Sequence, residues 1–292
     1  MCGRCRYAVS ASEILSCCPS GTAYQAGDQP EFRENFGPGM KSLIAIKDGK
    51  EVSLKTAKWG LIPAYTKGPI SSSMFFKKFN ARADNLKLVH SRLLGKKHCV
   101  AFFSGYYEWK TMHDALTGKD VKQPYYIYPK NDDILCFAGL YDELGDPETG
   151  ERIRTFTLIT VDASQALKGI HSRMPVVLST KENISLWLNT KSWNDKLFDL
   201  LIPDNKTLRF HPVGKGVGST KFQESSCSKE VKLARPLPSV LSFFPKKRKP
   251  LDGCDSKVDG LVKNEKRGSS DGDVSKVDGL VNKKAKVVIS ID

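Results

Sequence analysis

Short apolar runs separated by turn residues fill the chain up to about residue 213 and predict many strands rather than long helices. The runs 43–46 and 52–57 flank an Asp-Gly pair, which is a strong signal for a β-hairpin. The run 99–103 is continuously apolar, as expected of a buried strand. Further strands are predicted at 7–9, 125–128, 135–140, 155–161, 176–178 and 208–213.

Helical periodicity is confined to a few segments. Ser10 and Glu13 have the spacing of a capping box, which predicts the start of a helix. The segments 86–94 and 181–188 are also predicted to be helical, the second with Trp187 on its apolar face. The expected architecture is therefore a β-rich domain with flanking helices.

The composition changes at about Ser225, after which Ser, Lys, Asp and Gly dominate and aromatic residues almost vanish. A segment with so few apolar side chains cannot bury enough surface to offset its chain entropy. We therefore expect a folded domain over residues 1–222 and a disordered basic tail over residues 223–292.

Three segments of the tail resemble targeting or docking peptides. Residues 245–250 (PKKRKP) have the form of a nuclear-import signal, so a nuclear protein is expected; the alternative is a solvated basic run. Residues 240–244 resemble the end of a sliding-clamp-binding peptide, although Leu237 stands where Gln is usual. Residues 287–292 resemble a SUMO-interacting strand, which would extend the partner's sheet.

Charge sets the expected partner. The chain has 46 Lys and Arg against 32 Asp and Glu, a formal net charge of +14, which suits nucleic acid before a membrane. No apolar run reaches the roughly 18 residues of a membrane span. The first residues also lack a signal peptide, so we expect an intracellular protein with reduced thiols. No heptad pattern argues for a coiled-coil partner, so a monomer is expected.

Cys2 is the first candidate nucleophile. Removal of Met1 would leave Cys2 with a free α-amine beside its thiol, and both groups titrate near neutrality. Such a 1,2-aminothiol condenses with an aldehyde to an imine and then to a five-membered thiazolidine ring. The alternative is an ordinary chain end that frays into solvent.

A metal site would be another use of these cysteines. Cys2 and Cys5 have C-x-x-C spacing, but Cys17 and Cys18 are adjacent and no second C-x-x-C or H-x3-5-H pair exists. Zinc sites need four well-placed ligands. We therefore expect neither a metal nor another cofactor.

The segment 75–84 interleaves aromatic rings with cations, among them Lys77 and Lys78. One interpretation is a nucleic-acid surface, with the cations meeting phosphates and the rings stacking on bases. The other is that the Phe residues belong to the core and the lysines are merely solvated. The sequence leaves both open.

Two further residues suggest proton transfer. Glu108 is flanked by Tyr106, Tyr107 and Trp109, so it is either a buried carboxyl group with a raised pKa or an edge-strand residue facing water. His171 lies on a predicted loop close to Arg173, where it is either a proton shuttle or a structural residue.

Five motifs in order resemble the SOS-response-associated peptidase (SRAP) family. They are Met-Cys-Gly-Arg at the start, 59–63 (WGLIP), Asn80-Ala-Arg82, 105–109 (GYYEW) and 170–175 (IHSRMP). The tail places the chain nearest the eukaryotic branch of that family. The resemblance implies an α/β (α+β) fold with a barrel-like core that binds single-stranded DNA and crosslinks to abasic sites through a thiazolidine.

The resemblance also implies roles for single residues. Cys2 would be the nucleophile, Asn80 would position its amine, Glu108 would be the acid/base carboxylate, and His171 would assist sugar ring opening. The residues implied or expected to contact DNA are Arg4, Pro38, Trp59, Lys77, Lys78, Arg82 and Arg173.

Two positions depart from the family pattern. Asp84 stands where relatives commonly have Glu, and Tyr65 replaces an aromatic that is often Trp. Two other functions stay open from the sequence alone. One is a non-covalent reader of modified or damaged DNA; the other is a thiol (auto)peptidase using Cys2 and His171. Schiff-base chemistry would also permit a lyase reaction.

Overall fold

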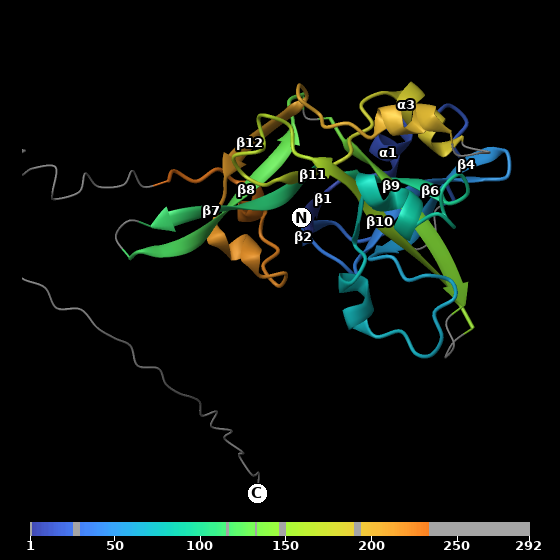
Figure 1. Ribbon diagram of the computed structural model, residues 1–292, viewed down its shortest axis with the longest axis horizontal. Helices are drawn as coiled ribbons and strands as arrows, with labels where there is room; N and C mark the ends of the chain where they lie inside the picture. Colours follow the sequence, from blue (N-terminus) through green and yellow to red (C-terminus); the bar gives the residue numbers. More distant parts are fainter. Residues whose placement is uncertain are drawn as a thin grey trace, which may run out of the picture. The chain divides into compact units, whose positions relative to one another are not determined.

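Two β-sheets dominate the described part of the chain, and no strand belongs to both (Figure 1). The computed structural model describes residues 2–25, 30–114, 117–131, 133–145, 150–189 and 194–233. The import, clamp-binding and SUMO-interacting segments predicted in the tail lie outside these residues. Among the described residues, no helix has the length and apolar character needed to cross a membrane.

The first sheet closes on itself into a barrel. Its cyclic order is β10 (Arg152–Asp162), β4 (Glu51–Trp59), β3 (Lys41–Asp48), β6 (His98–Phe103) and β9 (Leu135–Gly145), which returns to β10. Only the β10–β4 pair of this ring is parallel. Closure leaves no free edge in the ring, and all six side chains of β6 are buried. The predicted barrel-like core is confirmed.

Strand β10 also pairs with two short strands outside the ring. The strand β5 (Asn80–Arg82) runs parallel to its centre, and β11 (Arg173–Pro175) runs antiparallel to its end. The motifs Asn80-Ala-Arg82 and 170–175 are therefore brought together by one strand, although they are far apart in the sequence.

The second sheet is antiparallel, with the order β12 (Leu208–Pro212), β8 (Lys119–Pro129), β7 (Gly105–Asp114), β1 (Arg4–Tyr7) and β2 (Arg33–Phe36). Only Ser104 separates β6 of the barrel from β7 of this sheet. In Figure 1 the β7–β8 ribbon extends to one side, and β1 lies close to the barrel strands.

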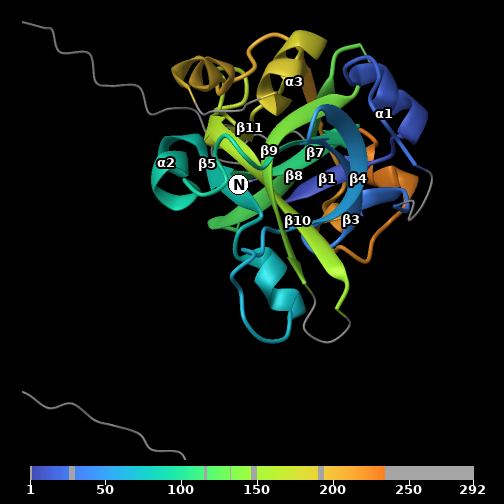
Figure 2. The same ribbon diagram turned by 90° about the vertical axis from the view of Figure 1, so that its right-hand side faces the viewer.

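Short helices surround the strands (Figure 2). α1 (Ala11–Cys17) begins with the predicted capping box of Ser10 and Glu13, and α3 (Lys181–Leu188) buries Trp187 as predicted. The remaining helices are α2 (Leu86–Val89) and the 3-10 turns η1 (Ser72–Phe76), η2 (Ala83–Asn85), η3 (Asp195–Leu200), η4 (Lys215–Gly218) and η5 (Ser225–Ser228).

The predicted helix over 86–94 is too long. It stops at Val89, and the chain turns so that Leu93 and Leu94 are both buried. The chain continues in turns instead, with the backbone N–H groups of Leu93 and Leu94 both donating to the carbonyl of His90. The strand predicted at 176–178 is likewise displaced: β11 covers 173–175, and Val177 makes a single bridge to Phe137.

The domain continues a few residues past the expected boundary at 222. Cys227 of η5 is buried with Tyr107, Tyr126 and Val213, and the N–H of Val231 donates to the carbonyl of Pro212. Residues expected in the tail thus pack on the second sheet, because Cys227 supplies an apolar contact that the polar composition around it conceals.

Candidate active site

Cys2 lies two residues before the start of β1 and is 1% exposed. Its carbonyl oxygen accepts a hydrogen bond from Nδ2 of Asn80 at 2.5 Å. Asn80 is the first residue of β5, where it is paired with Leu158 of β10. The barrel therefore holds the start of the chain through one amide side chain.

Glu108 of β7 is buried, with 3% of its surface exposed. Burial raises the pKa of its carboxyl group to about 7, although the positive charge of the amino terminus and a hydrogen bond from the Trp109 backbone act to lower it. At neutral pH the protonated and ionised forms are both populated. A carboxyl group in this state can donate and accept protons.

His171 lies on the loop between β10 and β11, and its Nδ1 is 3.9 Å from Oε1 of Glu108. The backbone N–H of Arg173 donates to Nδ1 at 3.0 Å, so a neutral ring carries its proton on Nε2. Burial and the charge of the amino terminus lower the pKa of His171, while the Arg173 carbonyl acts to raise it. The ring is thus held in its neutral form at pH 7.

Two residues of this site were not predicted from the sequence. Cys5 of β1 has its Sγ 4.0 Å from Sγ of Cys2, and it is paired across the sheet with Tyr106. Tyr106 is buried on the same face of β7 as Glu108, because strand side chains alternate. Its hydroxyl group has no hydrogen-bond partner among the described residues. Two spacings in the sequence point to these residues. Tyr106 lies two residues before Glu108, which is the repeat of one strand face, and Cys5 lies three residues after Cys2.

The structure therefore brings together the four residues expected to carry the chemistry, Cys2, Asn80, Glu108 and His171. They come from the start of the chain, from β5, from β7 and from a loop, and the two sheets are what make them neighbours. A thiol near a buried carboxyl group and a half-buried imidazole can act as a nucleophile.

The family model described as SOS response associated peptidase (SRAP) matches residues 1–220 of the chain. The chain belongs to the SRAP family.

Relatives of this SRAP chain extend from animals to bacteria. It is 28% identical to "Abasic site processing protein HMCES" of Xenopus tropicalis over 285 residues, covering 85% of this chain and 83% of the relative. It is 30% identical to the HMCES protein of Gallus gallus over 273 residues, covering 81% and 80%. "Abasic site processing protein YobE" of Bacillus subtilis is 36% identical over 195 residues, covering 65% of this chain and 84% of the relative.

A crystal structure of a Bacteroides thetaiotaomicron protein has the same fold. It superposes with a TM-score of 0.63 at 24% sequence identity, covering 79% of this chain and 100% of that one. The likeness shows a common fold at low sequence identity.

In this SRAP chain Arg4, expected to hold a phosphate, is used inside the protein. Its guanidinium group donates to Oδ1 of Asn35 at 2.9 Å and to the carbonyls of Val217 and Gly218, both at 3.1 Å. Burial lowers its pKa. Arg4 fastens β1 to η4, a contact that no local sequence pattern could reveal because 213 residues separate Arg4 from Val217.

Arg82 and Arg173 lie close together beside β10, each facing a carboxylate. Exposed Arg82 makes two hydrogen bonds to Asp84, at 2.6 and 3.1 Å. Arg173 donates to Oδ1 of Asp162 at 2.7 Å and to the carbonyl of Thr160 at 2.5 Å. A phosphate at this position would compete with Asp84 for Arg82 and with Asp162 for Arg173. The strength of the Arg82–Asp84 ion pair would therefore set how readily Arg82 could bind the phosphate instead.

Trp59 cannot contact DNA directly, which corrects its place among the DNA-binding residues. Its ring is fully buried, and its indole N–H donates to the carbonyl of Phe79 at 2.8 Å. Partly exposed Pro38 lies in the turn between β2 and β3, where the next residue, Gly39, donates to the Trp59 carbonyl at 2.7 Å. Trp59 thus contacts the turn that contains Pro38 from the interior of the protein.

The segment 75–84 divides between core and surface. Phe75 is buried, whereas Phe76 is 57% exposed and Lys77 is also exposed. Lys77 and half-buried Lys78 line a small cleft of about 130 Å³ with Leu61, Ile62, Pro63, Thr66 and Met74. The core interpretation therefore holds for Phe75, and the nucleic-acid interpretation of the exposed residues stays a prediction.

Proposed function

We propose that this protein processes abasic sites in single-stranded DNA and that Cys2 captures them covalently once Met1 is removed. The observation that carries the proposal is the position of Cys2, held by Asn80 beside the Glu108–His171 pair. Membership of the SRAP family and relatives named abasic site processing proteins support the same reaction.

The first step would be imine formation. The free α-amine of Cys2 attacks the aldehyde carbon of the ring-opened deoxyribose and gives a carbinolamine. Glu108, protonated in part at neutral pH, donates a proton to the departing hydroxyl group, which leaves as water. His171 in its neutral form exchanges protons during sugar ring opening. From the same imine, removal of a C2′ proton with departure of the 3′ phosphate would form a C2′=C3′ double bond, which is a lyase reaction.

The second step would be ring closure. The Cys2 sulfur adds to the imine carbon and the thiol proton passes to the nitrogen, which completes a thiazolidine. Asn80 limits the motion of Cys2 through its carbonyl, so the amine and the thiol meet the same carbon. Reversal requires protonation of the ring, for which the Glu108 carboxyl group is the nearest assigned acid.

Intact mass tests this proposal. The full chain is incubated with a single-stranded oligonucleotide that carries one abasic site, beside the variants Cys2→Ala and Cys17→Ala. We expect a heat-stable adduct that lacks Met1 for the wild type and for Cys17→Ala, and none for Cys2→Ala, because only Cys2 can supply both amine and thiol.

Two other outcomes would redirect the proposal. Binding of the oligonucleotide without an adduct would favour a non-covalent reader of damaged DNA. Turnover of peptides that depends on Cys2 and His171, with no adduct, would favour a thiol (auto)peptidase. An undamaged oligonucleotide of the same sequence separates encounter binding, which weakens as salt rises, from covalent capture.

Replacement of Cys5 by Ala is expected to slow thiazolidine closure about fivefold while leaving imine formation unchanged. Burial raises the pKa of Cys5, so it remains a thiol and can donate to the Cys2 sulfur 4.0 Å away. Loss of this Cys5–Cys2 hydrogen bond, worth about 1 kcal/mol, corresponds to a decrease of about fivefold in the closure rate. Borohydride quenching at successive times separates imine from thiazolidine, and equal closure rates would remove this role from Cys5.

We also propose nuclear localisation, carried by residues 245–250. Single-stranded DNA is the proposed partner of the domain's cations, among them Lys77, Arg82 and Arg173. Replacing the four cations of this segment in a fluorescent fusion tests the localisation without altering the domain. Contacts to a sliding clamp and to SUMO stay predictions of the tail sequence.

A further inference from the structure

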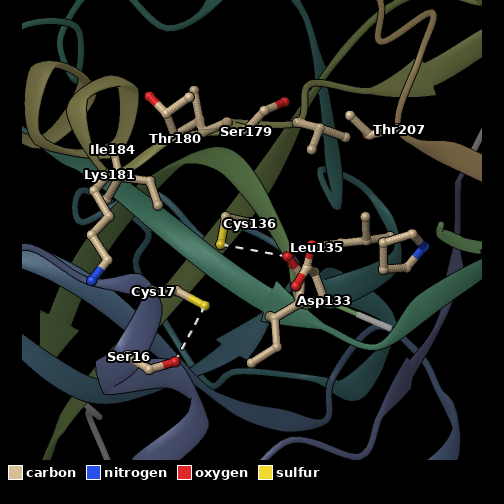
Figure 3. A pocket seen from close by; sticks show the side chains of 14 residues that line it. Ser16, Cys17, Asp133, Leu135, Cys136, Ser179, Thr180, Lys181, Ile184 and Thr207 are labelled. Atoms are coloured by element: carbon tan, nitrogen blue, oxygen red, sulfur yellow. Dashed lines mark hydrogen bonds between the residues drawn. The ribbon is translucent and has the colours of Figure 1, made fainter. Parts of the chain in front are cut away.

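A second pair of thiols faces a pocket outside the Cys2 site. Cys17 is the last residue of α1, and Cys136 is the second residue of β9. Both line a pocket of about 350 Å³, together with Ser16, Asp133, Thr180 and Lys181. Figure 3 shows both sulfur atoms directed into the space between α1 and β9.

The two sulfurs differ in ionisation. The neighbouring Cys136 thiol is the largest influence that lowers the pKa of Cys17 to about 6; the hydroxyl of Ser16, 3.9 Å from the Cys17 sulfur, and the charge of Lys181 act the same way, against burial and Asp133. The proximity of Cys17 and burial raise the pKa of Cys136 well above its ordinary value, and its Sγ donates to the carbonyl of Ile134 at 3.8 Å. The pocket thus holds a thiolate beside a protonated thiol.

Access differs as well. Cys17 is half-buried and reaches solvent through the pocket, whereas Cys136 is 4% exposed. Hydroxyl groups of Ser16, Ser179 and Thr180 line the same pocket, as does Lys181. A small polar molecule can therefore reach Cys17 first and Cys136 only afterwards.

A metal does not account for this pair. Among the described residues, no group of three His, Cys, Asp or Glu side chains has the arrangement of a metal site. The neighbouring Cys18 is buried, which raises its pKa to about 12 and leaves it unsuited as a thiolate ligand. The pocket is left with two candidate thiols, the accessible Cys17 and the buried Cys136.

We propose that Cys17 and Cys136 form a peroxide-reactive site, in which Cys17 is the attacking thiol and Cys136 the resolving thiol. The Cys17 thiolate attacks the outer oxygen of a small hydroperoxide; the O–O bond breaks and the alkoxide leaves as an alcohol after taking a proton from water. Cys17 is then a sulfenic acid. The Cys136 sulfur attacks it, an S–S bond forms, and the hydroxyl leaves with the Cys136 proton as water.

The balance is two electrons. The two cysteines are oxidised to one disulfide, and the hydroperoxide is reduced to an alcohol and water. The product would tie the end of α1 to β9, in a pocket that Cys2 does not line. The chain leaves α1 at Cys18 in an extended conformation, with φ −77° and ψ 161°, so the adjustment that closes the bond falls at a helix end.

The test uses the full chain with Cys2→Ala and Cys254→Ser, which removes the candidate nucleophile and a cysteine outside the described residues. After one equivalent of hydrogen peroxide, intact mass is expected to show the loss of two hydrogens. Peptide mapping is expected to place the disulfide between Cys17 and Cys136. In the same background, Cys136→Ser is expected to accumulate a sulfenic acid at Cys17 that dimedone traps.

Cys18 is the matched control, because it is the next residue and is buried. We expect Cys17 to react about 100-fold faster than Cys18, since its larger thiolate fraction outweighs its lower intrinsic nucleophilicity. Equal rates at the two positions, or a persistent sulfenic acid with Cys136 intact, would overturn the proposal. Circular dichroism of each variant separates lost reactivity from lost folding: a folded Cys17→Ser variant that still forms a disulfide at Cys136 would also refute it.

Discussion

Glu108→Gln is expected to slow crosslinking to an abasic site by about 10²- to 10⁴-fold, the usual contribution of a positioned general acid. The amide keeps the size of the carboxyl group but cannot deliver a proton to the departing hydroxyl. DNA binding should stay within about twofold of the wild type, because proton transfer contributes to the reaction and not to the encounter. Single-turnover kinetics with an abasic oligonucleotide measure both quantities.

The pH dependence provides the sharper readout of Glu108. Its pKa is raised from 4.5 to about 7, so its acid form is lost as pH rises through 7. The Cys2 amine, with an ordinary pKa of about 8, becomes reactive over the following interval, which predicts a bell-shaped rate profile. Glu108→Gln should lack the descending limb. Glu34→Gln, on β2 of the same sheet, is the control and should keep the wild-type profile.

A wild-type rate in folded Glu108→Gln would assign the acid role elsewhere. Tyr106 is then the next group to replace, because its buried hydroxyl group lies on the same face of β7. Tyr106→Phe would decide between the two.

Gly60→Ala is expected to lower the free energy of unfolding by about 3 kcal/mol or more, from backbone strain and a backbone clash together. Gly60 has φ +111°, and an added Cβ would lie 2.1 Å from the carbonyl oxygen of Phe75. Its own N–H donates to the carbonyl of Phe156 at 2.8 Å, so the backbone has no room to move away. Urea unfolding followed by circular dichroism measures the change.

Gly49→Ala is the matched control for this experiment. Gly49 has φ +62° in the β3–β4 turn, and an added Cβ there meets no atom within 4 Å. Its expected cost is about 1 kcal/mol, from backbone conformation alone. A difference of less than about 1 kcal/mol between the two variants would mean that the 75–78 segment can withdraw from Gly60.

Local signals in the sequence predicted local structure well. The Asp-Gly turn, the capping box at Ser10 and the α3 helix are all confirmed, because each depends on neighbours within a few residues. The helix beginning at Leu86 was predicted too long, because Leu93 and Leu94 are buried from turns rather than from a helical face, and such tertiary packing leaves no local sequence signal.

The site was predictable only in part. Motif resemblance identified Cys2, Asn80, Glu108 and His171. No spacing rule could have placed them together, because their proximity depends on β10 and the second sheet. Arg4 and Trp59 show the limit of the motif: their residue types match the family, but their contacts lie inside the protein. The sequence presents Cys5 only as half of a C-x-x-C metal motif.

The position of β1 inside the second sheet has a consequence for the synthesis of this protein. Its residues Arg4 to Arg6 pair with Gly105 to Tyr107, which leave the ribosome about 100 residues later. At roughly 5–20 residues per second, this interval lasts about 5–20 s. If a separate aminopeptidase exposes Cys2, as the proposed function requires, it meets an unpaired chain end only before the sheet closes, because the folded chain buries Cys2. The fraction of competent protein would then depend on the rate of translation through the first third of the message.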